Sequence, residues 1–122
     1  MSLKEWRARN RERFNQNQQE WRKNNPKKVL QYQLKKYDIT VEEYEELLKR
    51  QHGRCAICDS DDPGPKKMFF PVDHDHETGR VRGLLCWTCN VGLGCFKDNP
   101  VLLRLAADYI ENARKEAESH AA

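Results

Sequence analysis

The stretch VDHDHETGRVRGLLCWTCN, residues 72–90, decides how this chain is expected to fold and what chemistry it can carry. It holds two successive Asp-His pairs, a Cys-x-x-Cys pair and an asparagine directly after the second cysteine. The apolar pattern predicts two short antiparallel strands, over residues 68–73 and 80–85, followed by a helix at about residues 87–96. Groups that bind metals or move protons are therefore concentrated on one hairpin and the start of one helix.

A second Cys-x-x-Cys pair precedes this stretch, and the two pairs together predict a zinc site. Cys55 and Cys58 are separated by 27 residues from Cys86 and Cys89, which leaves room for a hairpin. Two such pairs can place four thiolates around one tetrahedral Zn²⁺. Structural zinc would supply folding free energy to a chain that is 34% charged. Two disulfides or buried free thiols are the alternatives, and the fifth cysteine, Cys95, is expected to be buried on its helix.

The Asp-His run between the cysteine pairs predicts a second, catalytic metal site. Asp73 and the side-chain carbonyl of Asn90 would give oxygen ligands to Mg²⁺, which needs few protein ligands when phosphate supplies others. His74 has the chemistry of a general base. A polar hairpin loop is one alternative, and histidines that complete the zinc site are another, although four cysteines already fill it. A calcium loop fails because Thr78 and Leu84 stand where such a loop needs Gly and Glu.

Positive charge is concentrated at the N-terminus. Residues 1–36 carry eleven Lys or Arg against three Glu, a net +8, whereas residues 37–49 sum to −4 and residues 50–122 to −1. Such a segment suits a polyanion, because each neutralised phosphate releases counterions. No apolar run approaches the roughly 20 residues of a membrane span. The N-terminus also lacks the apolar core of a secretory signal, so an intracellular protein is expected.

The basic segment is expected to be a helical arm. Residues 3–23 read as a polar helix with Trp6, Phe14 and Trp21 near one face, and a second basic helix follows the break at Pro26. We identify no internal repeat in the chain. The arm, residues 1–36, is therefore separated from a domain that comprises residues 37–122.

The domain is expected to open and close with helices. Thr40 and Glu43 fit a capping box, and Gly53 is a natural stop for the helix that follows. Pro100 opens a last helix. Its apolar positions are predicted to form a buried side: Leu102, Leu105, Ala106, Tyr109, Ile110 and Ala113.

The coupled motifs, Cys55-x-x-Cys58 followed by VDHDHETGRVRGLLCWTCN, resemble the recombination endonuclease VII family of phage and bacterial DNA nucleases. This family belongs to the wider His-Me finger, or ββα-metal, group that includes the HNH nucleases. The resemblance covers about residues 44–98. It implies an α+β fold with a zinc-stapled ββα-metal (His-Me finger) core and flanking helices, to which this chain adds its basic N-terminal helical arm.

The resemblance also implies roles for individual residues. The zinc ligands would be Cys55, Cys58, Cys86 and Cys89. Asp73 and Asn90 would bind a catalytic Mg²⁺ or Mn²⁺, and His74 would be the general base. His76 would contact substrate or support His74.

The chain is therefore interpreted as a metal-dependent DNA endonuclease of the cytoplasm of a bacterial or phage-infected cell. Its DNA partner would be duplex or branched, including four-way junctions, and the family also implies a homodimer; no membrane partner is expected. Arg80 and Arg82 alternate along the second strand and could hold the phosphate. The alternative is a zinc-ribbon module that binds nucleic acid without cutting it. The arm fits both readings, but a pure ribbon has no need of Asp73, His74 and Asn90.

Overall fold

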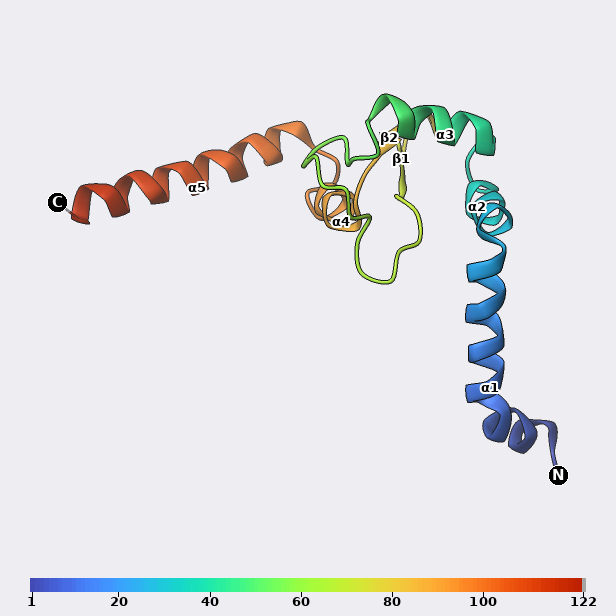
Figure 1. Cartoon of the computed structure of the whole chain (residues 1–122). Helices are drawn as coiled ribbons and strands as arrows, with labels where there is room; N and C mark the ends of the chain where they lie inside the picture. Colours follow the sequence, from blue (N-terminus) through green and yellow to red (C-terminus); the bar gives the residue numbers. More distant parts are fainter. Residues whose placement is uncertain (122) are drawn as a thin grey trace. The chain divides into compact units, whose positions relative to one another are not determined.

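The computed structural model describes residues 1–121 and shows an α+β protein (Figure 1). It contains the helices and strands α1 (Leu3–Asn24), α2 (Pro26–Leu34), α3 (Val41–Arg50), β1 (Val72–His74), β2 (Val81–Leu84), α4 (Trp87–Cys95) and α5 (Pro100–Ala121). Two compact units divide the chain, one over Met1–Leu47 and the other from Leu48 onward. The functional division at residues 36 and 37 stays a prediction.

Helices α1 and α2 form where the sequence predicts the basic arm. Ser2 and Glu5 cap the start of α1 reciprocally, and α1 contributes no buried residue. Pro26 occupies the first turn of α2, whose buried residues are Val29, Leu30 and Leu34. The basic arm therefore presents almost all of α1 to solvent.

Helix α3 begins and ends as its sequence predicts. The Thr40 hydroxyl accepts a hydrogen bond from the Glu43 backbone N–H at 3.1 Å, and Val41 and Tyr44 are buried. Gly53 adopts a φ of 71°, and its N–H donates to the Leu48 carbonyl at 2.9 Å. This left-handed conformation suits glycine, which closes the helix and starts the loop that carries the first cysteine pair.

Strands β1 and β2 form the predicted antiparallel hairpin, although both are shorter than expected. Val72 pairs with Leu84, Asp73 with Gly83, and His74 with Val81, so the register is irregular between Asp73 and His74. The pairing leaves Arg82 as an extra residue on β2. Such an irregularity bends a strand and changes the direction of a side chain.

A glutamine side chain secures the other edge of β2. The Gln51 side chain donates to the Leu84 carbonyl at 2.9 Å and accepts from the Leu84 N–H at 3.0 Å. A Cβ atom at Gly83 would lie 3.2 Å from the Gln51 Oε1 atom. The small residue at Gly83 thus leaves room for Gln51, which fixes β2 to the loop before Cys55.

The core of the second unit lies around the hairpin. Its buried apolar residues are Phe70, Val72, Leu84 and Leu85, together with Cys55 and Cys86. One cysteine from the loop before β1, Cys55, and one from directly after β2, Cys86, therefore belong to this core.

The prediction that α5 has a buried apolar side is wrong for a single copy of the chain. Leu102, Leu105, Tyr109 and Ile110 are 38%, 57%, 77% and 49% exposed, respectively. Ala113 is also exposed, and Ala106 is half-buried. Amphipathic periodicity predicts which residues share a face, but it does not say what covers that face. No helix in the described part of the chain combines the length and apolar character needed to cross a bilayer.

Candidate metal centre and active site

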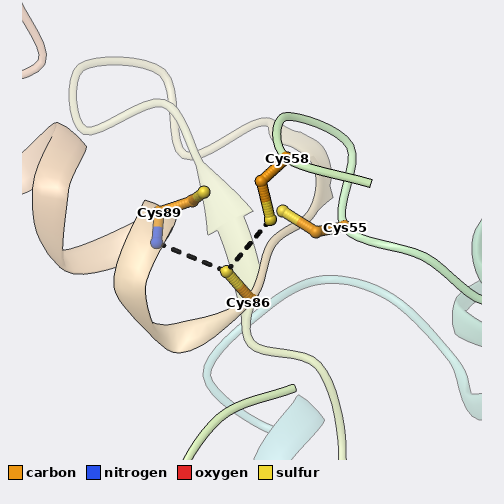
Figure 2. A group of neighbouring side chains, drawn as sticks. All are labelled: Cys55, Cys58, Cys86 and Cys89. Atoms are coloured by element: carbon orange, nitrogen blue, oxygen red, sulfur yellow. Dashed lines mark hydrogen bonds between the residues drawn. The ribbon is translucent and has the colours of Figure 1, made fainter. Parts of the chain in front are cut away.

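Four cysteine side chains converge on one point (Figure 2). The sulfur atoms of Cys55, Cys58, Cys86 and Cys89 all lie within 4.8 Å of one another, and those of Cys58 and Cys86 are 3.7 Å apart. Sulfurs bound at about 2.3 Å to a tetrahedral Zn²⁺ lie about 3.8 Å apart, so this donor set fits zinc. The predicted cluster is confirmed, and all five cysteines are free thiols.

A backbone N–H donates to the first cysteine sulfur in each of the two Cys-x-x-Cys turns. The Ile57 N–H donates to the Cys55 sulfur at 3.5 Å, and the Cys89 N–H donates to the Cys86 sulfur at 3.5 Å. Cys86 is also the N-cap of α4, so its sulfur lies at the positive end of that helix. The N–H contact to Cys55 favours its thiolate, which is the form that binds metal.

The environment gives the thiols of Cys55 and Cys89 opposite shifts in pKa. Burial pushes the pKa of Cys55 upward, but the backbone N–H groups of Cys58, Cys86 and Ile57 outweigh it and lower this pKa to about 6. Burial and the neighbouring sulfurs raise the pKa of Cys89 above its ordinary value. Four sulfurs this close cannot all be charged by themselves, and a divalent cation among them would stabilise every thiolate.

The carboxylates of Asp73 and Asp98 both bind Arg82, the β2 residue that has no partner residue on β1. This arrangement is called the arginine clamp below. Arg82 Nε and Nη2 donate to the two oxygens of Asp73 at 2.8 and 2.9 Å. Arg82 Nη1 and Nη2 donate to the two oxygens of Asp98 at 2.9 and 2.8 Å. These bonds raise the pKa of Arg82 further, and Arg82 lowers the pKa of Asp98. A guanidinium has five N–H donors, so one remains for a further acceptor.

Asp98 is a site residue that sequence reasoning missed. It follows α4, and both Lys97 and Asp98 have a positive φ, 55° and 56°. Asp tolerates this left-handed conformation better than most residues, which is the single local signal available. Its pairing with Arg82, sixteen positions earlier, has no counterpart in any sequence motif.

The Asp-His run divides between strand and turn. Asp73, on β1, is 9% exposed, and His74 ends the same strand. The His74 and His76 rings lie 4.8 Å apart between centroids and are tilted by 58°. Asp75 builds the turn instead, because its side chain accepts from the N–H groups of Glu77 and Thr78, which lowers its pKa.

The second predicted magnesium ligand lies on the helix that carries the last of the predicted zinc ligands. Asn90 is half-buried on α4, directly after Cys89, and its backbone N–H donates to the Cys86 carbonyl at 3.0 Å. Asn90 is therefore adjacent in the chain to a cysteine of the cluster. Asp73 is hydrogen-bonded to Arg82 across the hairpin. Cys95, at the end of α4, is exposed, and the expectation that it is buried is wrong.

Asp98→Asn is expected to lower the free energy of unfolding by a small amount, because the Arg82–Asp98 pair is partly exposed. Since Arg82 lowers the pKa of folded Asp98, the pair stabilises the fold above the ordinary carboxyl range and this contribution is lost as the pH falls through the folded pKa. Denaturant unfolding at pH 7 measures it in full. Asp108→Asn, an exposed carboxylate on α5, is the control. Equal stability of both variants would contradict a stabilising clamp.

These features define a class: a small α+β protein with a hairpin, a following helix and a cluster of four cysteines that could hold a metal ion. Within that class, the chain belongs to the recombination endonuclease VII family, whose model matches residues 30–112. The family that the sequence motifs indicated is thereby confirmed.

Curated relatives come from mycobacteriophages. The Gene 59 protein of Mycobacterium phage D29 is 46% identical over 78 residues, which cover 63% of this chain and 46% of the relative. The Gene 59 protein of Mycobacterium phage L5 is 44% identical over 80 residues, covering 65% of this chain and 48% of the relative. The aligned part is thus about half the length of either relative. No solved structure gives a significant match.

Proposed function

We propose that this protein is a metal-dependent endonuclease that hydrolyses phosphodiester bonds in DNA, with branched and four-way junction DNA among its substrates. One observation carries the proposal: Asp73 and His74 are adjacent on β1, while Asn90 follows a cysteine of the zinc-type cluster on α4. Membership of the endonuclease VII family supports it. The protein would act in the cytoplasm of a bacterial or phage-infected cell, where its DNA lies.

The core would be a His-Me finger. Its support is the succession of β1, β2 and α4, which is the strand–strand–helix order of the ββα-metal group. The cysteine cluster combines Cys86 at the start of α4 with Cys55 from the loop before β1. Zinc bound there would hold the helix and the hairpin in one rigid unit.

Asp73 has the donor chemistry for a catalytic cation. A carboxylate has about four lone-pair sites, and Arg82 takes one on each oxygen, which leaves capacity for a hard ion such as Mg²⁺ or Mn²⁺. The Asn90 side-chain carbonyl would be the second ligand. A bound Mg²⁺ would neutralise charge that develops on the scissile phosphate.

The imidazole of His74 would take a proton from the attacking water. The water oxygen would bond to phosphorus as the bond from phosphorus to the 3′ oxygen breaks. The departing 3′ oxygen would take a proton from solvent, which gives 5′-phosphate and 3′-hydroxyl products. The free donor of Arg82 would contact a phosphate oxygen, and Asp73 and Asp98 would hold the guanidinium in place. His76, whose ring lies beside that of His74, would support the base or contact the substrate.

The proposed assembly is a homodimer. The exposed apolar residues of α5, Leu102, Leu105 and Tyr109 among them, offer one surface that a second copy could cover. Sedimentation of the protein at several concentrations would establish its state.

Supercoiled plasmid and a synthetic four-way junction, each incubated with Mg²⁺, test the proposed activity. We expect nicking or resolution that stops when EDTA removes the divalent cation and returns when Mg²⁺ is restored. DNA binding should persist in EDTA, since phosphate contacts by basic side chains do not need the ion. Binding without any cleavage of either substrate would favour the zinc-ribbon binder instead.

A further inference from the structure

The basic arm contains a repeat that we did not predict. Residues 6–18, WRARNRERFNQNQ, align with residues 21–33, WRKNNPKKVLQYQ, at a shift of 15 positions. Trp, Arg, Asn and two Gln recur at equivalent places, and Phe14 aligns with Val29. The expectation that the chain has no internal repeat is therefore wrong.

The two repeats share a structural detail as well as a pattern. The Asn10 side chain donates to the Trp6 carbonyl at 2.7 Å, and the Asn25 side chain donates to the Trp21 carbonyl at 2.8 Å. The same amide thus folds back on the same backbone oxygen in each repeat. Asn25 is also the N-cap residue of α2, but its side chain makes no cap hydrogen bond to that helix.

Each repeat borders an open groove. The first groove, of 530 Å³, is lined by Trp6, Arg7, Asn10, Arg11, Phe14 and Asn15. The second, of 610 Å³, lies between α1 and α2, and its walls include Phe14, Gln18, Trp21, Arg22, Tyr32 and Gln33. Phe14 lines both grooves, and each groove has a Trp-Arg pair at equivalent positions.

The grooves combine aromatic, amide and cationic groups. Trp6, Phe14, Trp21 and Tyr32 are 55%, 60%, 47% and 69% exposed, which is unusual for such large apolar rings. The Lys35 ammonium lies 4.4 Å from the centre of the Tyr32 ring, so positive charge reaches the second groove. The arm as a whole carries a net +8 over residues 1–36.

We propose that the arm is a tandem binding element in which both grooves receive unpaired bases of one DNA strand. The rings would stack on the bases, the amides would bond base edges, and the surrounding Arg and Lys would hold phosphates. Trp6 and Trp21 lie on one continuous helix about 22 Å apart, which corresponds to roughly six or seven nucleotides at 3.4 Å each. This inference takes from the proposed function only that DNA is the partner.

The chemistry of the lining favours a strand with free bases over the other occupants. Bases in an intact duplex are stacked on one another, so they cannot reach a ring on the protein surface. An apolar protein partner would leave Arg7, Arg22 and the groove amides without acceptors. The arm would therefore direct the nuclease toward DNA that has unpaired segments, such as flaps, gaps and branch points.

A 20-nucleotide oligothymidine and a 20-base-pair duplex, both labelled, test the proposal by fluorescence anisotropy in EDTA at fixed salt. Trp6→Ala and Trp21→Ala are each expected to weaken oligothymidine binding about fivefold or more, and the double variant by the product of the two factors. Duplex binding should change less than twofold. Trp21→Phe should restore most of the affinity, because a ring can still stack.

Phe96→Ala is the matched control, since this exposed aromatic residue follows α4, outside the arm and outside the proposed dimer surface. Alanine is a strong helix former, so circular dichroism should show unchanged helix content. Unchanged oligothymidine affinity in the double variant would overturn the proposal, as would equal losses on duplex and single strand. Loss of self-association without loss of DNA binding would assign the grooves to a second copy. None of these outcomes depends on cleavage, so each is separate from the nuclease test.

Discussion

Replacement of Cys58 by serine is expected to unfold the hairpin and α4, while α1 and α2 keep their helical structure. Structural zinc contributes on the order of 10–16 kcal/mol of apparent binding free energy in small domains, which equals or exceeds the 5–15 kcal/mol total stability of a typical fold. Here Cys55 and Cys86 are also buried core residues. Loss of the metal would therefore remove both the cross-link and the reason for the core to close.

The measurement is zinc content by elemental analysis, together with hydrogen exchange of residues 72–95. The wild-type protein should hold one zinc per chain and protect the amides of β1, β2 and α4. Cys58→Ser should lose both properties, and a strong chelator should reproduce the effect on the wild-type protein. Cys95→Ser is the matched control, because Cys95 is an exposed thiol outside the cluster. A Cys58→Ser protein with native protection and no zinc would refute the structural role.

His74→Ala is expected to reduce the rate of DNA cleavage by about 10²–10⁴-fold, which is the usual contribution of a general base. DNA binding and zinc content should change little, because His74 lies on the hairpin and outside the cysteine cluster. The appropriate assay is single-turnover cleavage with saturating enzyme, which separates the chemical step from product release.

His120→Ala, which removes an exposed histidine on α5, is the control for nonspecific effects of losing an imidazole. His76→Ala should have a smaller effect than His74→Ala if His76 supports the base or the substrate. Full activity of His74→Ala would eliminate this residue as the base. Loss of binding together with activity would assign it a role in substrate contact instead.

Local chemistry explains the parts of the fold that the sequence predicted. Thr40 caps α3, Gly53 ends it, and Pro26 and Pro100 stand at the starts of their helices. Each signal acts within a few residues, so it can be recognised without knowledge of the fold. The spacing of the two cysteine pairs predicted the cluster for a similar reason, because the metal geometry is fixed.

The parts that were missed depend on contacts between distant residues. The exposed apolar face of α5 could not be foreseen, since periodicity alone is the same for a covered and an uncovered helix face. The clamp on Arg82 depends on the irregular register of the hairpin and on the left-handed turn at Asp98. Asp75 belongs to the Asp-His run, but its carboxylate accepts backbone hydrogen bonds that stabilise the turn between the strands. The four residues of the Asp-His run, 73–76, thus have different roles that the sequence alone does not separate.

Cys86 both belongs to the cluster and caps α4. The four cysteine positions therefore differ in which other ligand residues they would tolerate. Histidine is an alternative zinc ligand, and at the exposed Cys58 position its bulkier ring would meet solvent. At position 86 the sulfur also accepts the Cys89 N–H and begins α4, from a buried site. A nitrogen ligand there would retain the ion but lose the start of the helix that carries Asn90. Drift toward mixed Cys-His coordination in related chains would then be tolerated at 58 and resisted at 86.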